Sequence, residues 1–170
     1  MDDEAVVARQ LGRAPRAFRR VVTRCPYGVP AVTEQSPYDS RGEPFPTTYY
    51  LTCPHLVAAV ARLEAAGGVA RWSNAAADDE ELTRSLAQTT EEQRLIRREL
   101  AEGRVGRDGG ESLDLGIAGS RSPGQLKCLH AHVAYALAQP GYVLGTRILD
   151  EVDPLWPTGA CCSGELLAGS

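Results

Sequence analysis

The stretch PTTYYLTCPHL, residues 46–56, decides the fold because a strand pattern in it changes directly into a helix start. Residues 47–52 are rich in β-branched and aromatic side chains, which favour extended structure. Pro54 suits the first turn of a helix, where a missing N–H costs nothing. The sequence therefore predicts a strand over residues 47–52 and a helix that begins at Cys53-Pro54 and ends at Gly67-Gly68.

Two further strands are expected before this stretch. Residues 18–24, FRRVVTR, have a strand composition and lead into the turn residues 25–28, CPYG. A second strand is expected over residues 30–34, and a short helix up to Leu11, where Gly12 stops it. The sequence therefore predicts an α+β fold, with a small antiparallel sheet of about three strands packed with several helices in a single domain.

The middle of the chain predicts a helical hairpin followed by a loop. Residues 79–103 are charged and helical, and a capping box at residues 90–93 favours two helices joined near Thr89. The hairpin is either a solvated cover over the core or a surface for a protein partner. Residues 104–124 are rich in Gly, Asp and Ser and predict a long loop, which is functional or disordered. The apolar seam of the hairpin consists of Leu82, Leu86, Ile96 and Leu100.

One more long helix is expected, from Ser122-Pro123 to Ala138, because this serine and proline form a cap and a first turn. Residues 145–152 predict a short helix or strand. The domain is thus expected to cover residues 1–150, and residues 151–170 form a tail rich in Pro, Gly and Cys. The core face of the helix consists of Leu126, Leu129, Val133 and Leu137.

Composition limits the classes of partner. The chain has 170 residues, 43% hydrophobic and 24% charged, which is typical of a soluble globular domain. A net charge of −4 gives no general attraction to nucleic acid or to an anionic membrane, and no leader or spanning stretch is apparent. We therefore expect a cytoplasmic protein that binds neither nucleic acid nor membrane and keeps its five cysteines reduced.

Four residues form the candidate metal site: Cys25, Cys53, Cys128 and His132. Cys25 and Cys53 are each followed by proline, and the expected helix places Cys128 one turn before His132. Three thiolates and an imidazole suit zinc, whereas three thiolates alone suit an iron–sulfur cluster with one open iron. The other interpretation is that the cysteines are small buried hydrophobic residues and that His132 is a hydrogen-bonded core histidine.

Three residues beside this set are candidate catalytic groups. Lys127, the only lysine in the sequence, and Arg24 each adjoin a cysteine and could lower a thiol pKa or attract an anion. His130 points to the other side of the expected helix and is the weaker ligand. Cys161 and Cys162 in the tail could complete a site or resolve an oxidised thiol. No serine-nucleophile turn and no phosphate-binding loop is present.

Several blocks of the sequence resemble a known family. These blocks are RCPYGVPAV, GEPFPTTYYLTCPHL and GIAGSRSPGQLKCLHAHVAYALA, and they resemble the bacterial domain of unknown function 501, typical of actinobacteria. The resemblance implies no established activity, but it implies that Cys25, Cys53, Cys128, His130 and His132 occupy motif positions, whereas Cys161 and Cys162 lie outside the shared blocks. Neighbouring genes of the family suggest a link to cell-envelope or phosphate housekeeping. The chain departs from the family pattern at Tyr135 and at residues 142–145, YVLG.

Two functions follow from these patterns, and the sequence leaves open whether the chain is an enzyme. The first is a cytoplasmic Cys/His protein that binds zinc or an iron–sulfur cluster, with an unknown reaction. The second is a non-enzymatic interaction module with a structural zinc site or no metal, in which the helical hairpin contacts the partner. A redox thiol protein is a third and weaker interpretation, because no short-spaced resolving cysteine is present.

Overall fold

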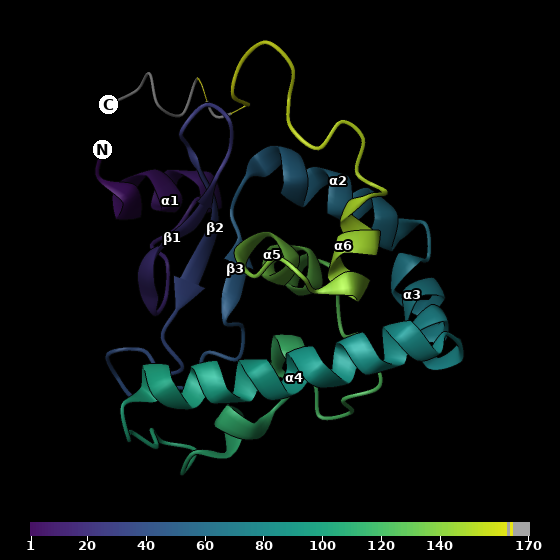
Figure 1. Cartoon of the computed structure of the whole chain (residues 1–170). Coiled ribbons are helices and arrows are strands. Elements are labelled where there is room, and N and C mark those ends of the chain that lie inside the picture. The colour runs from purple at the N-terminus through teal and green to yellow at the C-terminus, as the bar shows by residue number, and fades with distance from the viewer. Residues whose placement is uncertain (163, 165–170) are drawn as a thin grey trace.

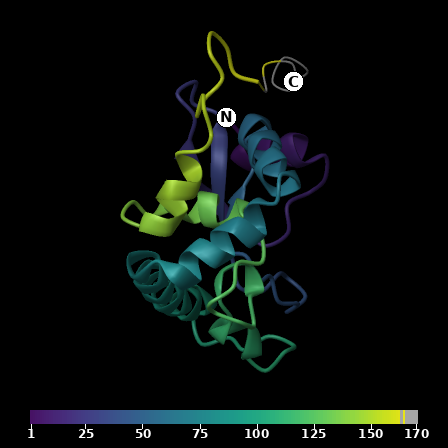
Figure 2. The same ribbon diagram turned by 90° about the vertical axis from the view of Figure 1, so that its right-hand side faces the viewer.

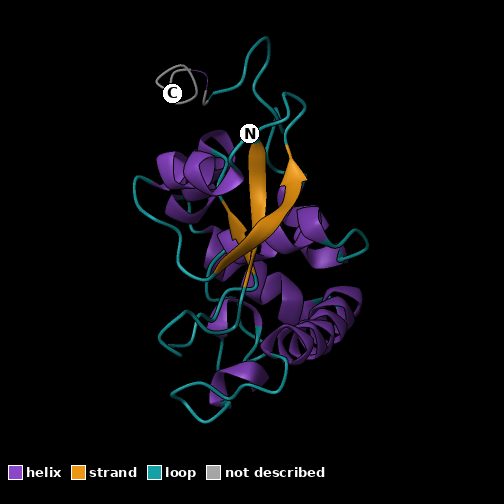
Figure 3. Cartoon of the chain, turned by 90° about the vertical axis from the view of Figure 1, so that its left-hand side faces the viewer, coloured by secondary structure: helices purple, strands orange, loops and turns teal. Residues whose placement is uncertain are grey.

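Figure 1 shows the computed structural model, which describes residues 1–162 and 164. The sheet is antiparallel with strand order β1-β2-β3, as the sequence predicts. Strand β2 lies in the middle and all of its residues are buried, because helices cover the sheet and Figure 3 shows them to both sides of the strands. The strands are β1 (Phe18–Arg24), β2 (Pro30–Gln35) and β3 (Tyr49–Leu51).

The helices beside the sheet begin where the sequence gives a cap. In α1 (Asp3–Leu11), the Asp2 carboxylate accepts the Ala5 N–H, and Gly12 ends the helix in the left-handed conformation. Helix α2 (Pro54–Ala65) begins directly after Cys53, as predicted. A third helix, α3 (Gly68–Asp78), follows it and was not predicted.

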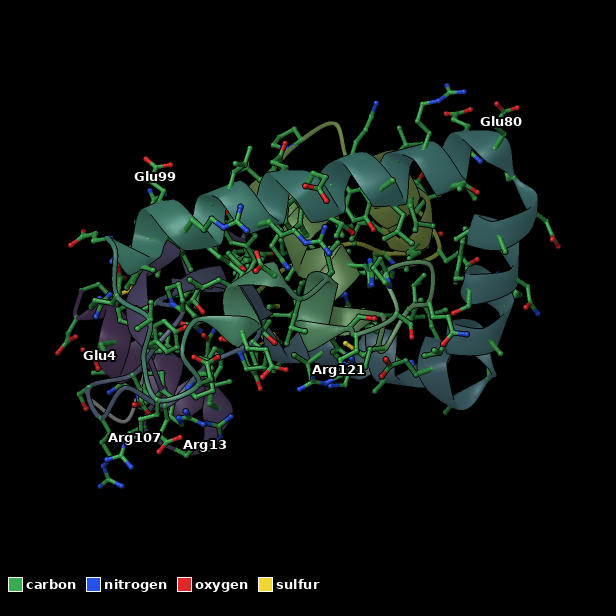
Figure 4. The ribbon with its side chains drawn as sticks, turned by 90° about the horizontal axis from the view of Figure 1, so that it is seen from below. Glu4, Arg13, Glu80, Glu99, Arg107 and Arg121 are labelled. Carbon is green, nitrogen blue, oxygen red and sulfur yellow. The ribbon has the colours of Figure 1, made fainter. Side chains whose placement is uncertain are left out.

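Helix α4 (Glu80–Ala101) corrects the prediction of two helices, because it runs through Thr89 without a break. It crosses the end of the molecule opposite the C-terminal tail in Figure 1, and Figure 4 shows Glu80 and Glu99 on its outer side. Helix α4 has 22 residues, but it is strongly charged. No helix in the described part of the chain is both long and apolar enough to cross a membrane.

The buried stripe of α4 changes character along the helix. Leu82 and Leu86 are buried as predicted, but Ile96 and Leu100 are only half-buried, so the predicted seam is wrong in the second half. Polar side chains replace it there, facing the loops around the sheet. The buried residues of α4 are Leu82, Ser85, Leu86, Thr89, Thr90, Gln93, Arg97 and Ala101.

Arg97 is the most unusual residue of this stripe. Its side chain is almost fully buried and donates one hydrogen bond, from Nη1 to Thr48 Oγ1 at 3.4 Å. Burial lowers the pKa of Arg97 to about 10, although Tyr38 and Asp108 oppose this shift. The guanidinium therefore remains a cation inside the protein at neutral pH.

Residues 104–124 fold over α4 as an ordered segment. The segment contains two short 3-10 helices, η1 (Glu111–Asp114) and η2 (Ile117–Gly119). Asp108 organises the segment, because its carboxylate accepts hydrogen bonds from the Tyr38 hydroxyl and from the backbone N–H groups of Gly110 and Ser112. The predicted loop is thus ordered rather than disordered, and a function for it stays a prediction.

Helix α5 (His130–Ala138) is shorter than predicted. Ser122 forms a turn with Gln125, and the helix begins only at His130. The Leu129 N–H donates to Glu64 Oε2 of α2 at 2.7 Å, so a distant carboxylate serves as part of the cap. The predicted core face is nevertheless confirmed: Leu126, Leu129 and Val133 are buried, and Leu137 packs against the core.

The last helix is α6 (Val143–Leu149), which decides the open choice between helix and strand in favour of helix. It packs on α5, and Gly145 allows a close approach. After it, the tail returns to the end of the sheet where the turn between β1 and β2 lies. Figures 1 and 2 show this position from two sides, with the tail in yellow.

Candidate functional site

Two Cys-Pro tripeptides hold the C-terminal tail. In the first, Cys25-Pro26-Tyr27, the Tyr27 hydroxyl donates to the Pro157 carbonyl at 2.8 Å. In the second, Cys53-Pro54-His55, His55 Nε2 lies 2.9 Å from the Pro154 carbonyl oxygen. Both tripeptides therefore fasten the tail through the residue that follows the proline.

Cys25 lies under the tail at the end of β1. Its backbone N–H donates to the Val29 carbonyl at 2.9 Å and closes the turn, and its side chain is buried with Val6 and Val29. Trp156 and Cys161 of the tail pack against this small cluster. A second sulfur is thus brought to the surroundings of Cys25.

Cys53 lies at the N-terminus of α2 and has a second cysteine beside it. Its sulfur accepts backbone hydrogen bonds from His55 and Leu56, and its side chain is hydrogen-bonded to that of Cys162. Burial raises the pKa of the Cys53 thiol to about 11, and Cys162 adds to the increase. Cys53 is therefore a neutral thiol at physiological pH unless a cation binds it.

Cys128 lies apart from the tail contacts, just before α5. The prediction that it shares a helix face with His132 is wrong, because the helix begins at His130. Its sulfur accepts hydrogen bonds from the backbone N–H groups of Ala131 and His130. Burial raises the pKa of the Cys128 thiol, and Lys127 opposes the increase only weakly.

His132 is a core residue. Its ring is 1% exposed, and Nδ1 lies 2.7 Å from the Tyr142 hydroxyl. Burial lowers the pKa of His132 to about 4, so the imidazole is neutral at physiological pH. Nε2 has no hydrogen-bond partner among the described residues. Tyr142 is one of the positions at which the chain departs from the family pattern, so the pattern does not predict this contact.

The three candidate catalytic residues lie in different settings. Arg24 donates to Asp3 at 2.7 Å and to the Gly28 carbonyl, so it ties α1 to the sheet. His130 lies between Glu64 Oε1 and the Val57 carbonyl oxygen, at 3.0 and 3.2 Å from its two ring nitrogens. Lys127 lines shallow surface depressions beside residues 119–126. The structure does not gather them around a common reacting centre.

The structure contains no preformed metal shell in the part that it describes. Among residues 1–162 and 164, no three His, Cys, Asp or Glu side chains form a group that is ready to hold a metal ion. Binding of zinc or an iron–sulfur cluster by Cys25, Cys53, Cys128 and His132 stays a prediction.

The structure places Cys161 and Cys162 beside the two Cys-Pro tripeptides, which the sequence did not predict. Both tail cysteines lie outside the motif blocks, and their spacing from Cys25 and Cys53 gives no local signal. One signal in the sequence is available: the chain contains two Cys-Pro dipeptides and also two adjacent cysteines. Together these four cysteines have the number that a tetrahedral metal site requires. Only the course of the tail brings these thiols to the end of the sheet.

Comparison with known proteins gives one match. The family model described as "Protein of unknown function (DUF501)" matches residues 21–150. No curated protein sequence and no solved structure matches the chain. The matched range includes both Cys-Pro tripeptides and the motif KCLHAH, and it ends before the tail cysteines.

Proposed function

The chain belongs to the DUF501 family of proteins of unknown function, and we propose that it is a metal-binding protein whose ligands are cysteine thiolates. The proposed ligands are Cys25 and Cys53 of the two tripeptides and Cys161 and Cys162 of the tail. Zinc suits four thiolates best, because structural zinc sites use such tetrahedral sets. An iron–sulfur cluster, which also takes four cysteines, is the other candidate.

The observation that carries the proposal is the course of the tail. Tyr27 and His55 anchor it at Pro157 and Pro154, a few residues before Cys161. Cys162 is then hydrogen-bonded to Cys53, and Cys161 packs on the cluster that contains Cys25. Binding would require Cys161 and Cys162 to move so that Cys25 and Cys53 share one ion with them.

The earlier ligand set has less support at two of its members. His132 is fully buried, and its Nδ1 is already engaged by the Tyr142 hydroxyl. Cys128 lines an apolar cavity, and its sulfur already accepts hydrogen bonds from the backbone N–H groups of Ala131 and His130. A site of Cys25, Cys53, Cys128 and His132 is therefore the alternative that the experiment must separate from the proposed one.

Proton release is a built-in property of the proposed site. Metal ligation removes the thiol proton, and the pKa of Cys53 is about 11 in the metal-free chain. Affinity for zinc is therefore expected to rise with pH throughout the physiological range. The N–H groups of His55 and Leu56, which already point at this sulfur, would stabilise the thiolate once it forms.

The proposal includes a reducing compartment such as the cytoplasm, because Cys25, Cys53, Cys128 and Cys162 form no disulfide and Cys162 is exposed. If the protein binds no metal, the alternative is an interaction module in which the outer face of α4 contacts a protein partner. The exposed side chain of Leu95 on that face favours this second candidate.

The test is to purify the full chain without oxygen, add zinc, remove the excess and count zinc, iron and sulfide per chain. We expect stoichiometric zinc in the wild type and in Cys128→Ser, and loss of the metal in Cys53→Ser and Cys162→Ser. Iron with equimolar sulfide and broad absorption of visible light would instead assign an iron–sulfur cluster to the same cysteines.

Cys128→Ser is the matched control, because Cys128 is half-buried and, like Cys53, accepts backbone hydrogen bonds at a helix start. Loss of metal in Cys128→Ser with full retention in Cys162→Ser would overturn the proposed ligand set in favour of the earlier one. A folded Cys53→Ser variant with its full metal content would overturn both sets.

A further inference from the structure

Two of the motif blocks, the one around Cys53 and the one around Cys128, line a common cavity away from the tail. It has a volume of about 620 Å³, within the range of small-molecule sites. Its lining comes from residues 47–61 and 128–131, with Gln10 and Leu11 of α1 at one side. The strand-to-helix stretch that decides the fold and the motif around Cys128 thus form opposite walls of one pocket.

Two residues of this lining each have a side-chain oxygen without a hydrogen-bond partner among the described residues. These oxygens are Thr52 Oγ1 and Gln10 Oε1, and both are buried. Thr52 is 1% exposed, so its hydroxyl is almost completely withdrawn from water. A buried hydroxyl or amide oxygen without a partner is unfavourable, so the two atoms indicate a polar ligand group.

Gln10 and Thr52 are both hydrogen-bonded to strand β2. Gln10 Nε2 donates to the Pro30 carbonyl at 2.8 Å, and the Thr52 N–H donates to the Ala31 carbonyl at 2.9 Å. Adjacent residues of β2 therefore hold the Gln10 side chain and the Thr52 backbone in place. Gln10 Oε1 can accept a hydrogen bond, and the Thr52 hydroxyl can donate or accept one.

The charge of the lining favours a neutral ligand. No Asp, Glu, Lys or Arg side chain lines the cavity, so an ammonium or carboxylate group inside it would lack an opposite charge. His130 is the one titratable nitrogen base in the lining, and Glu64 and the Val57 carbonyl already occupy its two ring nitrogens. The adjacent Glu64 carboxylate would neutralise a protonated ring.

The remaining walls are apolar and aromatic. Val57, Ala58 and Ala61 supply one face of α2, and Tyr49 and Tyr50 supply the sheet side. Tyr50 is held at the rim by a hydrogen bond from Arg13 Nη2 at 3.4 Å. Such walls suit a flat ring system, which packs well against aromatic side chains.

We propose that this cavity is a binding site for a neutral, largely apolar ring compound that carries a hydrogen-bond donor for Gln10 and an acceptor for Thr52. The Cys128 thiol, which lines the same cavity, lies beside the bound molecule. This site is separate from the proposed metal site, because none of the proposed metal ligands lines it.

The test uses three indole probes of similar size and different charge on the full chain: indole-3-carboxamide, indole-3-carboxylate and 3-(aminomethyl)indole. Binding is followed by NMR chemical-shift titration up to millimolar probe. We expect the carboxamide to bind about tenfold more tightly than either charged probe. Thr52→Val, which removes the hydroxyl at constant shape, should weaken carboxamide binding about fivefold.

Ala58→Trp tests the location, because Ala58 is exposed on α2 and lines the cavity, so a larger side chain there fills it without entering the core. Ala65→Trp on the same helix is the matched control, since Ala65 is exposed and does not line the cavity. If Ala58→Trp is misfolded by circular dichroism, Ala61→Phe replaces it.

We expect Ala58→Trp to abolish carboxamide binding and Ala65→Trp to leave it unchanged. Three results would overturn the proposal. These are equal or tighter binding of a charged probe, unchanged binding in the cavity-filling variant, and no binding of any of the three probes at millimolar concentration.

Discussion

The tail-covered end of the sheet and the interior around α5 both hold cysteine and histidine, but they hold them in opposite ways. At the tail, two side-chain hydrogen bonds fasten an irregular segment over Cys25 and Cys53. Around α5, His132 is fully buried and Gly145 allows direct helix contact. The comparison teaches that residues of one chemical type lie under an irregular segment in one region and pack inside a helical core in the other.

The largest difference between the two regions is expected in acid. The pKa of His132 is about 4 in the folded chain, below its ordinary value of 6.5, because of burial. Between these values the unfolded chain binds the proton and the folded chain does not, so stability falls as pH drops from 6.5 to 4. The total loss is about 3 kcal/mol.

Urea unfolding of the wild type and His132→Asn across this range measures the effect. The asparagine oxygen can still accept from the Tyr142 hydroxyl, but it does not titrate. The variant should therefore lack this part of the pH dependence. Parallel curves for the two proteins would contradict the assignment.

The thiol at the tail end gives the next effect. Because burial raises the pKa of Cys53 to about 11, its thiolate fraction near pH 8 is about a hundredfold below that of an ordinary cysteine. Iodoacetamide should modify Cys53 of the metal-free folded chain correspondingly slowly, as measured by mass spectrometry of digests. The same chain in urea is the control, and equal rates in both states would refute the prediction.

Close packing in the interior is tested by Gly145→Ala. A Cβ atom at residue 145 would lie 2.6 Å from the His132 carbonyl oxygen and 2.6 Å from a ring carbon of Tyr142. We expect a loss of about 2 kcal/mol in the free energy of unfolding, because overpacking displaces neighbouring groups. Gly124→Ala is the matched control, since a Cβ there meets nothing within 4 Å.

The smallest effect is expected at the tail anchor. Tyr27→Phe removes the hydrogen bond to Pro157, which we expect to stabilise the fastened tail by about 1 kcal/mol. Limited proteolysis of the tail should become about fivefold faster without a change in global unfolding. Tyr50→Phe, which removes a hydroxyl on another part of the surface, should leave the cleavage rate unchanged.

Local patterns were sufficient to predict the sheet and the start of α2. Phe18–Arg24 forms the predicted strand, and Pro54 stands at the first helical position. Both depend on turn residues and propensities that act over a few neighbours. The capping box at residues 90–93 failed for the opposite reason: Thr90 and Gln93 are buried in tertiary contacts, so α4 continues through them.

The candidate site was less predictable because its members come from distant segments. Cys25 and Cys53 were identified from their prolines, but the tail contacts span more than 100 residues between Cys53 and Cys162. Cys128 and His132 were paired by assuming a helix that starts at Ser122. No local signal shows that the true start depends on a carboxylate in α2.

That carboxylate also determines an order of assembly. Glu64 accepts the Leu129 N–H with one oxygen and contacts His130 with the other, although Leu129 lies 65 positions further along the chain. A helix as short as α5 is marginal on its own, because helix nucleation is unfavourable and the hydrogen bonds of nine residues do not offset it. Helix α5 is therefore expected to form only after α2 has docked, so that the motif KCLHAH is among the last parts of the chain to fold.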